Sequence, residues 1–217
     1  MSRELWDGVF AERSWGRWPS EAVVRSFSRL RESRTHPVVL EIGCGPGAQL
    51  RFLAEEGATT IGLDISTVAL GQARIRLDSH GLQSGLLAGD AVVLPIRDQS
   101  VDVVIEVEAL CCLDETHRAS AWQEVARSLA PGGRFLSVAF SVGTEGLDTL
   151  ERTSRLTFDA AEVGPFAGLG TLTLMDDDAI DYLAQQAGLR IVEVQTTSRT
   201  VGPDRLLVEE YVITASR

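Results

Sequence analysis

Short apolar runs alternate with amphipathic stretches from Val38 onward. The runs are rich in β-branched and other apolar residues and are bounded by Gly, Pro or Asp, as buried strands are. Such alternation is typical of βα units around a mostly parallel sheet. The pattern predicts five parallel strands, which are Val38–Ile42, Thr59–Leu63, Leu86–Ala88, Val101–Val107 and Arg134–Phe140.

Helices are expected between these strands, at Gln49–Glu56, Thr67–Ser79 and Glu115–Leu129. Ser66 and Asp114 stand at N-cap positions, where a side-chain oxygen accepts a hydrogen bond from a free backbone amide. Helix and strand therefore alternate regularly through the first half of the chain.

The last part of the chain has a different pattern. An irregular, glycine-containing stretch runs from Ser141 to Leu174, which is too long for an ordinary connection. A helix is expected at Asp177–Ala187. The β-rich runs Arg190–Thr200 and Leu206–Thr214 follow it, and the Gly-Pro-Asp turn between them can join them as antiparallel neighbours.

Before the first strand, Pro19 and Ser20 open an amphipathic helix. Its apolar face consists of Val23, Val24, Phe27 and Leu30. The aromatic residues that precede it are Trp6, Phe10, Trp15 and Trp18. Two interpretations remain open for this segment: its aromatic side chains pack in the core, or they form a lid over an active site.

Together these elements predict a Rossmann-like α/β fold: a doubly wound, mostly parallel, seven-stranded sheet with an antiparallel last strand and helices on both faces. A length of 217 residues suits one domain. Its expected parts are a helical lid or cap (1–35), a cofactor-binding core (36–140), an acceptor-site insertion (141–174) and a C-terminal helix and hairpin (175–217).

Composition narrows the possible partners. No segment approaches the roughly 20 apolar residues of a bilayer span, and the charged N-terminal segment resembles no export signal, so we expect a cytoplasmic protein without a membrane partner. The net charge of -11 repels a phosphate backbone, which disfavours nucleic acid. The cysteines Cys44, Cys111 and Cys112 lack zinc-ligand spacing, so reduced thiols and no metal are expected.

The most informative string is Glu41-Ile42-Gly43-Cys44-Gly45-Pro46-Gly47, in which a strand runs into a glycine turn that opens a helix. Such a turn lets a ligand approach the backbone, and the helix N-terminus favours a negative group there. Asp64 ends the next strand, where a carboxylate can accept hydrogen bonds from both hydroxyls of a ribose. The residues thus indicate a nucleoside ligand.

The chain resembles the small-molecule type of class I S-adenosylmethionine-dependent methyltransferases. The resemblance lies in this string, Asp64, Gly89-Asp90-Ala91 and the Leu129–Phe135 segment. The matches follow the family's order from about Val38 to Phe140. The segment from Trp15 to Pro19 and the pair Gly164-Pro165 add a narrower resemblance to small methyltransferases.

The resemblance implies S-adenosylmethionine as cofactor and S-adenosylhomocysteine as product. By it, Gly43, Cys44, Gly45 and Gly47 hold the methionine part, Glu41 orients the glycine loop and the cofactor's ammonium, Asp64 binds the ribose and Asp90 the adenine amino group, with Ile65 and Ala91 against the ring. The lid interpretation adds Trp15, and also Arg17 near the cofactor carboxylate.

Methyl transfer from a sulfonium needs positioning more than a nucleophilic side chain. A hydroxyl or amine acceptor must lose a proton, and Glu106 and Glu108 are the candidate catalytic bases. The structural alternatives are that Glu106 contacts the cofactor or a backbone amide, and that Glu108 caps a turn or faces solvent. Thr157, Phe158 and Phe166 of the insertion are expected to shape the acceptor pocket.

The favoured function is therefore O- or N-methylation of a small-molecule acceptor. The alternatives are a non-catalytic S-adenosylmethionine-binding protein and a nicotinamide-dependent oxidoreductase; the glycine spacing and the absence of a Tyr-x-x-x-Lys pair disfavour the latter. An RNA or protein methyltransferase is disfavoured by the acidic charge. The sequence fixes neither the methylated atom nor the choice between monomer and homodimer.

Overall fold

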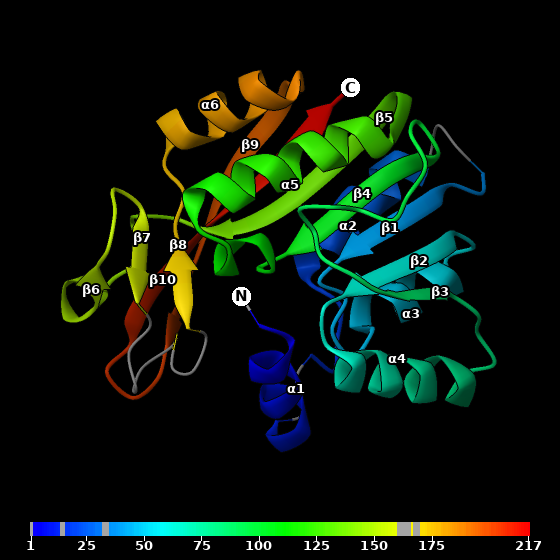
Figure 1. Ribbon diagram of the computed structural model, residues 1–217, viewed down its shortest axis with the longest axis horizontal. Helices are drawn as coiled ribbons and strands as arrows, with labels where there is room; N and C mark the ends of the chain where they lie inside the picture. Colours follow the sequence, from blue (N-terminus) through cyan, green and yellow to red (C-terminus); the bar gives the residue numbers. More distant parts are fainter. Residues whose placement is uncertain (1, 14–15, 32–34, 160–165, 167–169) are drawn as a thin grey trace.

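A computed structural model describes residues 2–13, 16–31, 35–159, 166 and 170–217. At its centre lies a seven-stranded sheet in the order β3-β2-β1-β4-β5-β10-β9 (Figure 1). Its strands are β1 (Val38–Ile42), β2 (Thr59–Asp64), β3 (Gly85–Ala88), β4 (Val101–Val107), β5 (Leu129–Phe140), β9 (Arg190–Val201) and β10 (Leu206–Ser216). The first five are mutually parallel, and β10 is antiparallel to both neighbours, which confirms the predicted sheet.

Helices cover both faces of the sheet (Figure 1). They are α1 (Arg3–Glu12), α2 (Glu21–Arg31), α3 (Ala48–Glu55), α4 (Thr67–Ser79), α5 (Glu115–Ser128) and α6 (Asp177–Ala187), with the short 3-10 helices η1 (Leu110–Cys112) and η2 (Leu147–Thr149). Side chains alternate across β1, so that Leu40 packs with Trp122 of α5, whereas Val39 packs with Phe27 of α2. Among the described residues, no helix is long and apolar enough to cross a membrane.

The predicted caps are confirmed. The side chains of Ser66 and Asp114 accept hydrogen bonds from the amides of Ala69 and His117, at the starts of α4 and α5. The largest boundary difference is at β5, which begins at Leu129 and not at Arg134; α5 ends one residue earlier than predicted. The Pro-Gly-Gly turn lies within β5 because a register shift against β4 accommodates it.

Helix α1 was not predicted. Ser2 caps it by accepting a hydrogen bond from the amide of Leu5, and Glu4 lies in its first turn, where a negative charge is favourable. Trp6 and Phe10 are four residues apart and therefore lie on one face of this helix. Of the aromatic residues before Pro19, Trp6 and Phe10 therefore lie in a helix. The sequence did not reveal this helix because it has too few apolar residues to show a helical spacing.

The stretch expected to be irregular contains an antiparallel sheet of three short strands, β6 (Glu151–Arg152), β7 (Thr157–Asp159) and β8 (Thr171–Thr173). Strands this short carry no readable periodicity. The buried guanidinium of Arg118 in α5 donates to the carbonyls of Thr173 and Leu174 at 3.0 and 2.8 Å. Burial lowers the pKa of Arg118 to about 10, so it stays charged at neutral pH. Helix α5 therefore anchors the small sheet.

Candidate functional site

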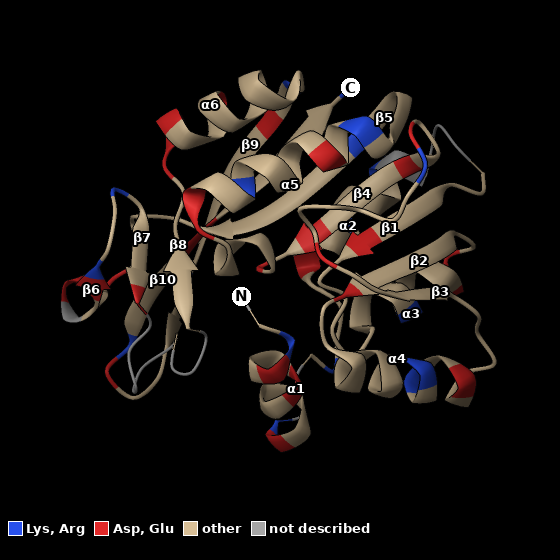
Figure 2. Ribbon diagram, viewed as in Figure 1, with Lys and Arg blue, Asp and Glu red and all other residues tan. Residues whose placement is uncertain are grey.

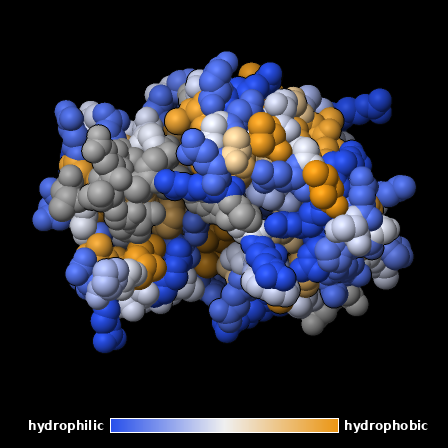
Figure 3. Space-filling view, turned by 90° about the horizontal axis from the view of Figure 1, so that it is seen from below, coloured by the Kyte–Doolittle hydropathy of each residue, from blue (hydrophilic) through white to orange (hydrophobic). Residues whose placement is uncertain are grey.

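A cavity of about 590 Å³ lies at the carboxyl ends of β1, β2 and β4. This is where the strand order reverses between β1 and β4, the usual ligand site in sheets of this kind. Figure 2 shows acidic residues concentrated at these strand ends. Seen from the side of α1, the outer surface is mostly hydrophilic with separate apolar areas (Figure 3).

The glycine turn forms one wall of the cavity. Gly43 has a φ of +66°, and a Cβ atom there would lie 2.3 Å from the Cβ of Ala109. Gly47, also with positive φ, precedes the first residue of α3 and offers no side chain to cap the free amides of that helix. Gly43, Cys44 and Gly45 line the cavity, while Gly47 lies behind them. The wall is thus backbone that a ligand can approach closely.

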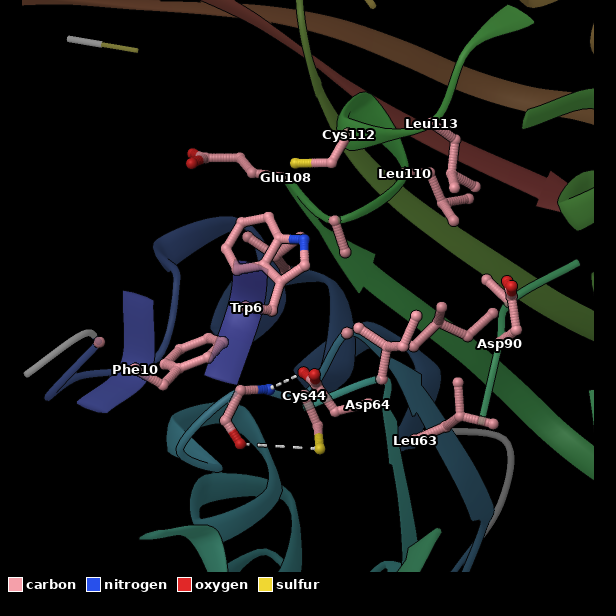
Figure 4. Close-up of a pocket in the computed structure, with 18 of the residues that line it drawn as sticks. Trp6, Phe10, Cys44, Leu63, Asp64, Asp90, Glu108, Leu110, Cys112 and Leu113 are labelled. Carbon is pink, nitrogen blue, oxygen red and sulfur yellow. Dashed lines mark hydrogen bonds between the residues drawn. The ribbon is translucent and has the colours of Figure 1, made fainter. Parts of the chain in front are cut away.

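Asp64 lies at the centre of this wall (Figure 4). One carboxylate oxygen accepts from the amide of Gly45 and the other from the amide of Ser66, both at 2.8 Å. Burial raises its pKa above the ordinary value, although the amides oppose that rise. A carboxylate offers about four acceptor positions, so about two remain for a ligand.

Asp90 lies at another end of the cavity, apart from Asp64 (Figure 4). Ile65 and Ala91 line the cavity as expected from the resemblance. The sequence interpretation missed Leu110 and Leu113, which project toward Asp90 in Figure 4. Their signal was weak because they follow β4 in a short 3-10 segment. A polar group framed by apolar side chains suits a heterocyclic ring.

Glu41 lies beneath the glycine turn, buried, and does not line the cavity. Burial and the neighbouring Asp64 charge hold its pKa well above the ordinary value. Among the described residues, its Oε2 atom finds no hydrogen-bond partner. This position fits support of the loop from below, and the contact of Glu41 with the cofactor's ammonium stays a prediction.

Glu106 is also buried and lies outside the cavity wall. Its carboxylate accepts from the hydroxyl of Ser137 and from the amides of Ala109 and Leu110, at 3.1 and 3.2 Å for the amides. These bonds fix the turn that leads into η1. Of the two interpretations offered for Glu106, the backbone contact agrees with this position, and its place away from the cavity argues against a catalytic base.

Glu108 is the candidate that lines the cavity. Its backbone is left-handed, with φ of +54°, a conformation that costs a non-glycine residue about 1 kcal/mol or more. The amide of Glu108 donates to the carbonyl of Val138 at 2.8 Å, which holds this turn against β5. Burial raises the pKa of its carboxyl, and the charge of Arg199 opposes the rise.

The N-terminal segment closes the cavity from one side. Trp6 and Phe10 of α1 line it with ring centroids 5.8 Å apart, and Gly16 and Trp18 line it further along the chain. Arg17 is exposed and outside the cavity wall, with its guanidinium 5.6 Å from the ring of Trp18.

One residue of the first motif of the narrower resemblance and the whole of the second cannot be placed. Trp15 and the pair Gly164-Pro165 lie outside the described residues. The proposed cofactor contact of Trp15 therefore stays a prediction.

Opposite the glycine turn, the cavity is apolar. Cys112 and Phe140 line it, together with Gly170 and Thr171 of the insertion. Thr157, Phe158 and Phe166 were expected here, but they are buried behind the wall, where Phe166 packs edge-on against Phe140 at 5.0 Å. The insertion thus contributes backbone and small side chains to the wall, with its aromatic residues as support.

Comparison with known proteins agrees with this site. Residues 39–133 match a family profile described as a methyltransferase domain. That match, the fold and the ordered motifs from the glycine turn to Asp90 identify the chain as a class I S-adenosylmethionine-dependent methyltransferase.

Individual relatives vary in how much of the chain they cover. The chain is 29% identical to methyltransferase GfsG of Streptomyces halstedii, over 94% of this chain and 75% of that protein. It is 33% identical to a ubiquinone/menaquinone biosynthesis C-methyltransferase of Acidiphilium cryptum, over 54% of this chain and 47% of that protein. A solved methyltransferase structure from Methanosarcina mazei has the same fold, with a TM-score of 0.69 and 21% identity over 84% of this chain and 92% of that one.

Proposed function

We propose that this methyltransferase methylates an oxygen or nitrogen atom of a small molecule bound in the apolar part of the cavity. The supporting observation is the shape of the cavity itself. A volume of about 590 Å³ joins a polar end, with Asp64 and Asp90, to an apolar end, with Trp6, Cys112 and Phe140. Sites of this volume hold small ligands, and the two ends suit a nucleoside and an apolar acceptor.

At the polar end, we assign the ribose hydroxyls to the remaining acceptor positions of Asp64. The adenine amino group goes to Asp90, with Ile65 and Ala91 against the ring. We place the methionine part along the glycine turn, because Gly43, Cys44 and Gly45 line the cavity there. Bound S-adenosylmethionine supplies an electrophilic methyl group whose leaving group is a neutral thioether.

At the apolar end, Glu108 takes the proton of the acceptor. Bound S-adenosylmethionine would supply its methyl group to the acceptor oxygen or nitrogen, which would leave S-adenosylhomocysteine. The acceptor proton passes to the Glu108 carboxylate, which later releases it to water. Walls of Trp6 and Phe140 exclude water and keep the reacting atoms in line.

Residues 141–174 act as the acceptor-site insertion in this proposal, through Gly170 and Thr171 in the cavity wall. Residues 1–35 act as the lid, through Trp6 and Phe10. A small acceptor also agrees with the acidic charge of the chain, which disfavours nucleic acid.

Calorimetric titration tests the cofactor assignment. S-adenosylmethionine and S-adenosylhomocysteine should bind in the micromolar range, and NAD and NADP should not bind. Asp64→Asn should weaken binding of both at least about tenfold, because an amide replaces one acceptor oxygen with a donor. Asp204→Asn, in the turn between β9 and β10, is the matched control. Binding of a nicotinamide cofactor, or equal affinities in both variants, would overturn the assignment.

A further inference from the structure

Three charged side chains from three different strand regions meet beside the acceptor end of the cavity. Glu108 follows β4, Arg199 lies in β9 and Glu210 lies in β10. One guanidinium nitrogen of Arg199, Nη1, donates to Oε1 of Glu210, and the other, Nη2, lies 3.7 Å from Oε1 of Glu108. Arg199 therefore stands between two carboxylates, one of which lines the cavity.

The two contacts of Arg199 differ in kind. Glu210 is 8% exposed and accepts a direct hydrogen bond, so it holds the guanidinium in place. The distance of 3.7 Å to Glu108 exceeds that of a hydrogen bond but lies within ion-pair range. Arg199 thus supplies charge to Glu108, whose oxygens stay available to a ligand. A guanidinium suits this task because its planar fork can face two carboxylates at once.

Glu108 needs such a partner. Its side chain is 32% exposed, in a cavity wall that also contains Cys112 and Phe140. Burial favours the neutral carboxylic acid, and the positive charge of Arg199 favours the carboxylate. The other ionisable groups nearby are Glu106, held by Ser137 and two amides, and Cys111, whose thiol donates to the carbonyl of Glu108. Neither of these supplies a positive charge.

We propose that Arg199 is a positioning residue of the methyl-transfer site: it holds the Glu108 carboxylate in the wall of the acceptor cavity, and Glu210 holds Arg199. The proposal rests on the proposed function, in which Glu108 receives the acceptor proton. It assigns a functional part to β9, the edge strand of the sheet, which also packs against β10 and α6.

Two substitutions should move the titration of Glu108 in opposite directions. Arg199→Gln removes the positive charge, so the pKa of Glu108 should rise. Glu210→Gln removes the carboxylate that shares Arg199, so the pKa of Glu108 should fall. Damage to the fold would not produce this pair of opposite changes.

The measurement is a carbon-13 NMR pH titration of the full chain labelled at the glutamate side-chain carboxyls. Loss of one resonance in Glu108→Gln identifies the Glu108 signal. Arg190→Gln, also in β9, is the matched control and should leave that titration unchanged. Arg199→Lys keeps the positive charge but lacks the planar guanidinium. The pKa of Glu108 in this variant should lie between its values in wild type and in Arg199→Gln.

An unchanged Glu108 midpoint in Arg199→Gln, or changes of the same sign in Arg199→Gln and Glu210→Gln, would overturn the proposal. The titration uses neither cofactor nor acceptor. Its failure is therefore distinguishable from failure of the proposed function, which the cofactor calorimetry reports separately.

Discussion

The carboxylate of Asp7 in α1 accepts a hydrogen bond from the hydroxyl of Ser66 at 2.6 Å and another from the amide of Val68 at 3.1 Å. Ser66 in turn donates its own amide to Asp64. Helix α1, which carries Trp6 and Phe10 into the cavity wall, is therefore attached to the segment that carries Asp64. One set of hydrogen bonds thus joins this helix to the Asp64 end of the cavity.

Breaking this connection should weaken both stability and cofactor binding. We expect Asp7→Ala to lower the unfolding free energy, because the acceptor for the Ser66 hydroxyl and for the Val68 amide at the start of α4 is lost. S-adenosylmethionine affinity should fall several-fold, since α1 no longer holds Trp6 over the site. Calorimetry and denaturant unfolding measure the two effects. Glu12→Gln at the end of the same helix is the control, and equal affinities in the two variants would contradict the coupling.

Substitutions at Gly43 and Gly132 distinguish the cost of backbone strain from the cost of a steric clash. Both have positive φ, of +66° and +74°, but a Cβ at Gly132 meets no atom within 4 Å. Gly132→Ala should therefore cost about 1 kcal/mol from strain alone. Gly43→Ala should cost more and abolish cofactor binding, because its Cβ also collides with Ala109. Equal losses of stability and retained binding in both variants would refute this account of the turn.

Stability should depend on pH through Glu41. The folded state raises the pKa of this carboxyl above its ordinary 4.5, so the folded state binds the proton more tightly than the unfolded chain. Folding stability is therefore highest at low pH on this account, and it falls as the pH rises above 4.5 toward the raised value.

Replacing Glu41 by Gln removes this loss. We expect Glu41→Gln to be more stable than wild type by about 1 kcal/mol at pH 8, with the difference vanishing near pH 4. Thermal unfolding at both pH values measures it. Glu193→Gln, on an exposed part of β9, provides the control. A variant that is less stable than wild type at pH 8 would show that the Glu41 charge is compensated in the folded protein.

Loss of the Glu108 carboxylate should affect chemistry more than cofactor binding. With an acceptor found by screening for S-adenosylhomocysteine release, Glu108→Gln should lower kcat about 100-fold and leave cofactor affinity within about twofold. In wild type, kcat should rise with pH through the raised pKa of Glu108, since only the carboxylate accepts a proton. A kcat in Glu108→Gln equal to that of wild type would exclude Glu108 as the base.

The sequence predicted well wherever one strong local rule applied. Buried parallel strands are continuous apolar runs, and the glycine turn and Asp64 lie at strand ends, so their positions followed from the pattern. The residues it missed depend on contacts across the fold. Arg199 reaches Glu108 from 91 positions away in sequence; nothing near either residue indicates the other.

Burial also separated residues that look equivalent in sequence. Glu106 lies in β4 and Glu108 follows two positions later, and both were candidate bases. Side chains two positions apart in a regular strand point to the same face, so strand periodicity would place both on one side. They are separated because the chain leaves regular strand geometry at the left-handed Glu108.

The anchor of the small sheet bears on how acceptor specificity can diverge. Arg118 binds the carbonyls of Thr173 and Leu174, and these carbonyls belong to the backbone whatever side chains accompany them. Substitutions in β8 can therefore alter the wall beside Thr171 without releasing it from α5. Because the attachment does not depend on the side chains of β8, these can change while the backbone stays bound to α5.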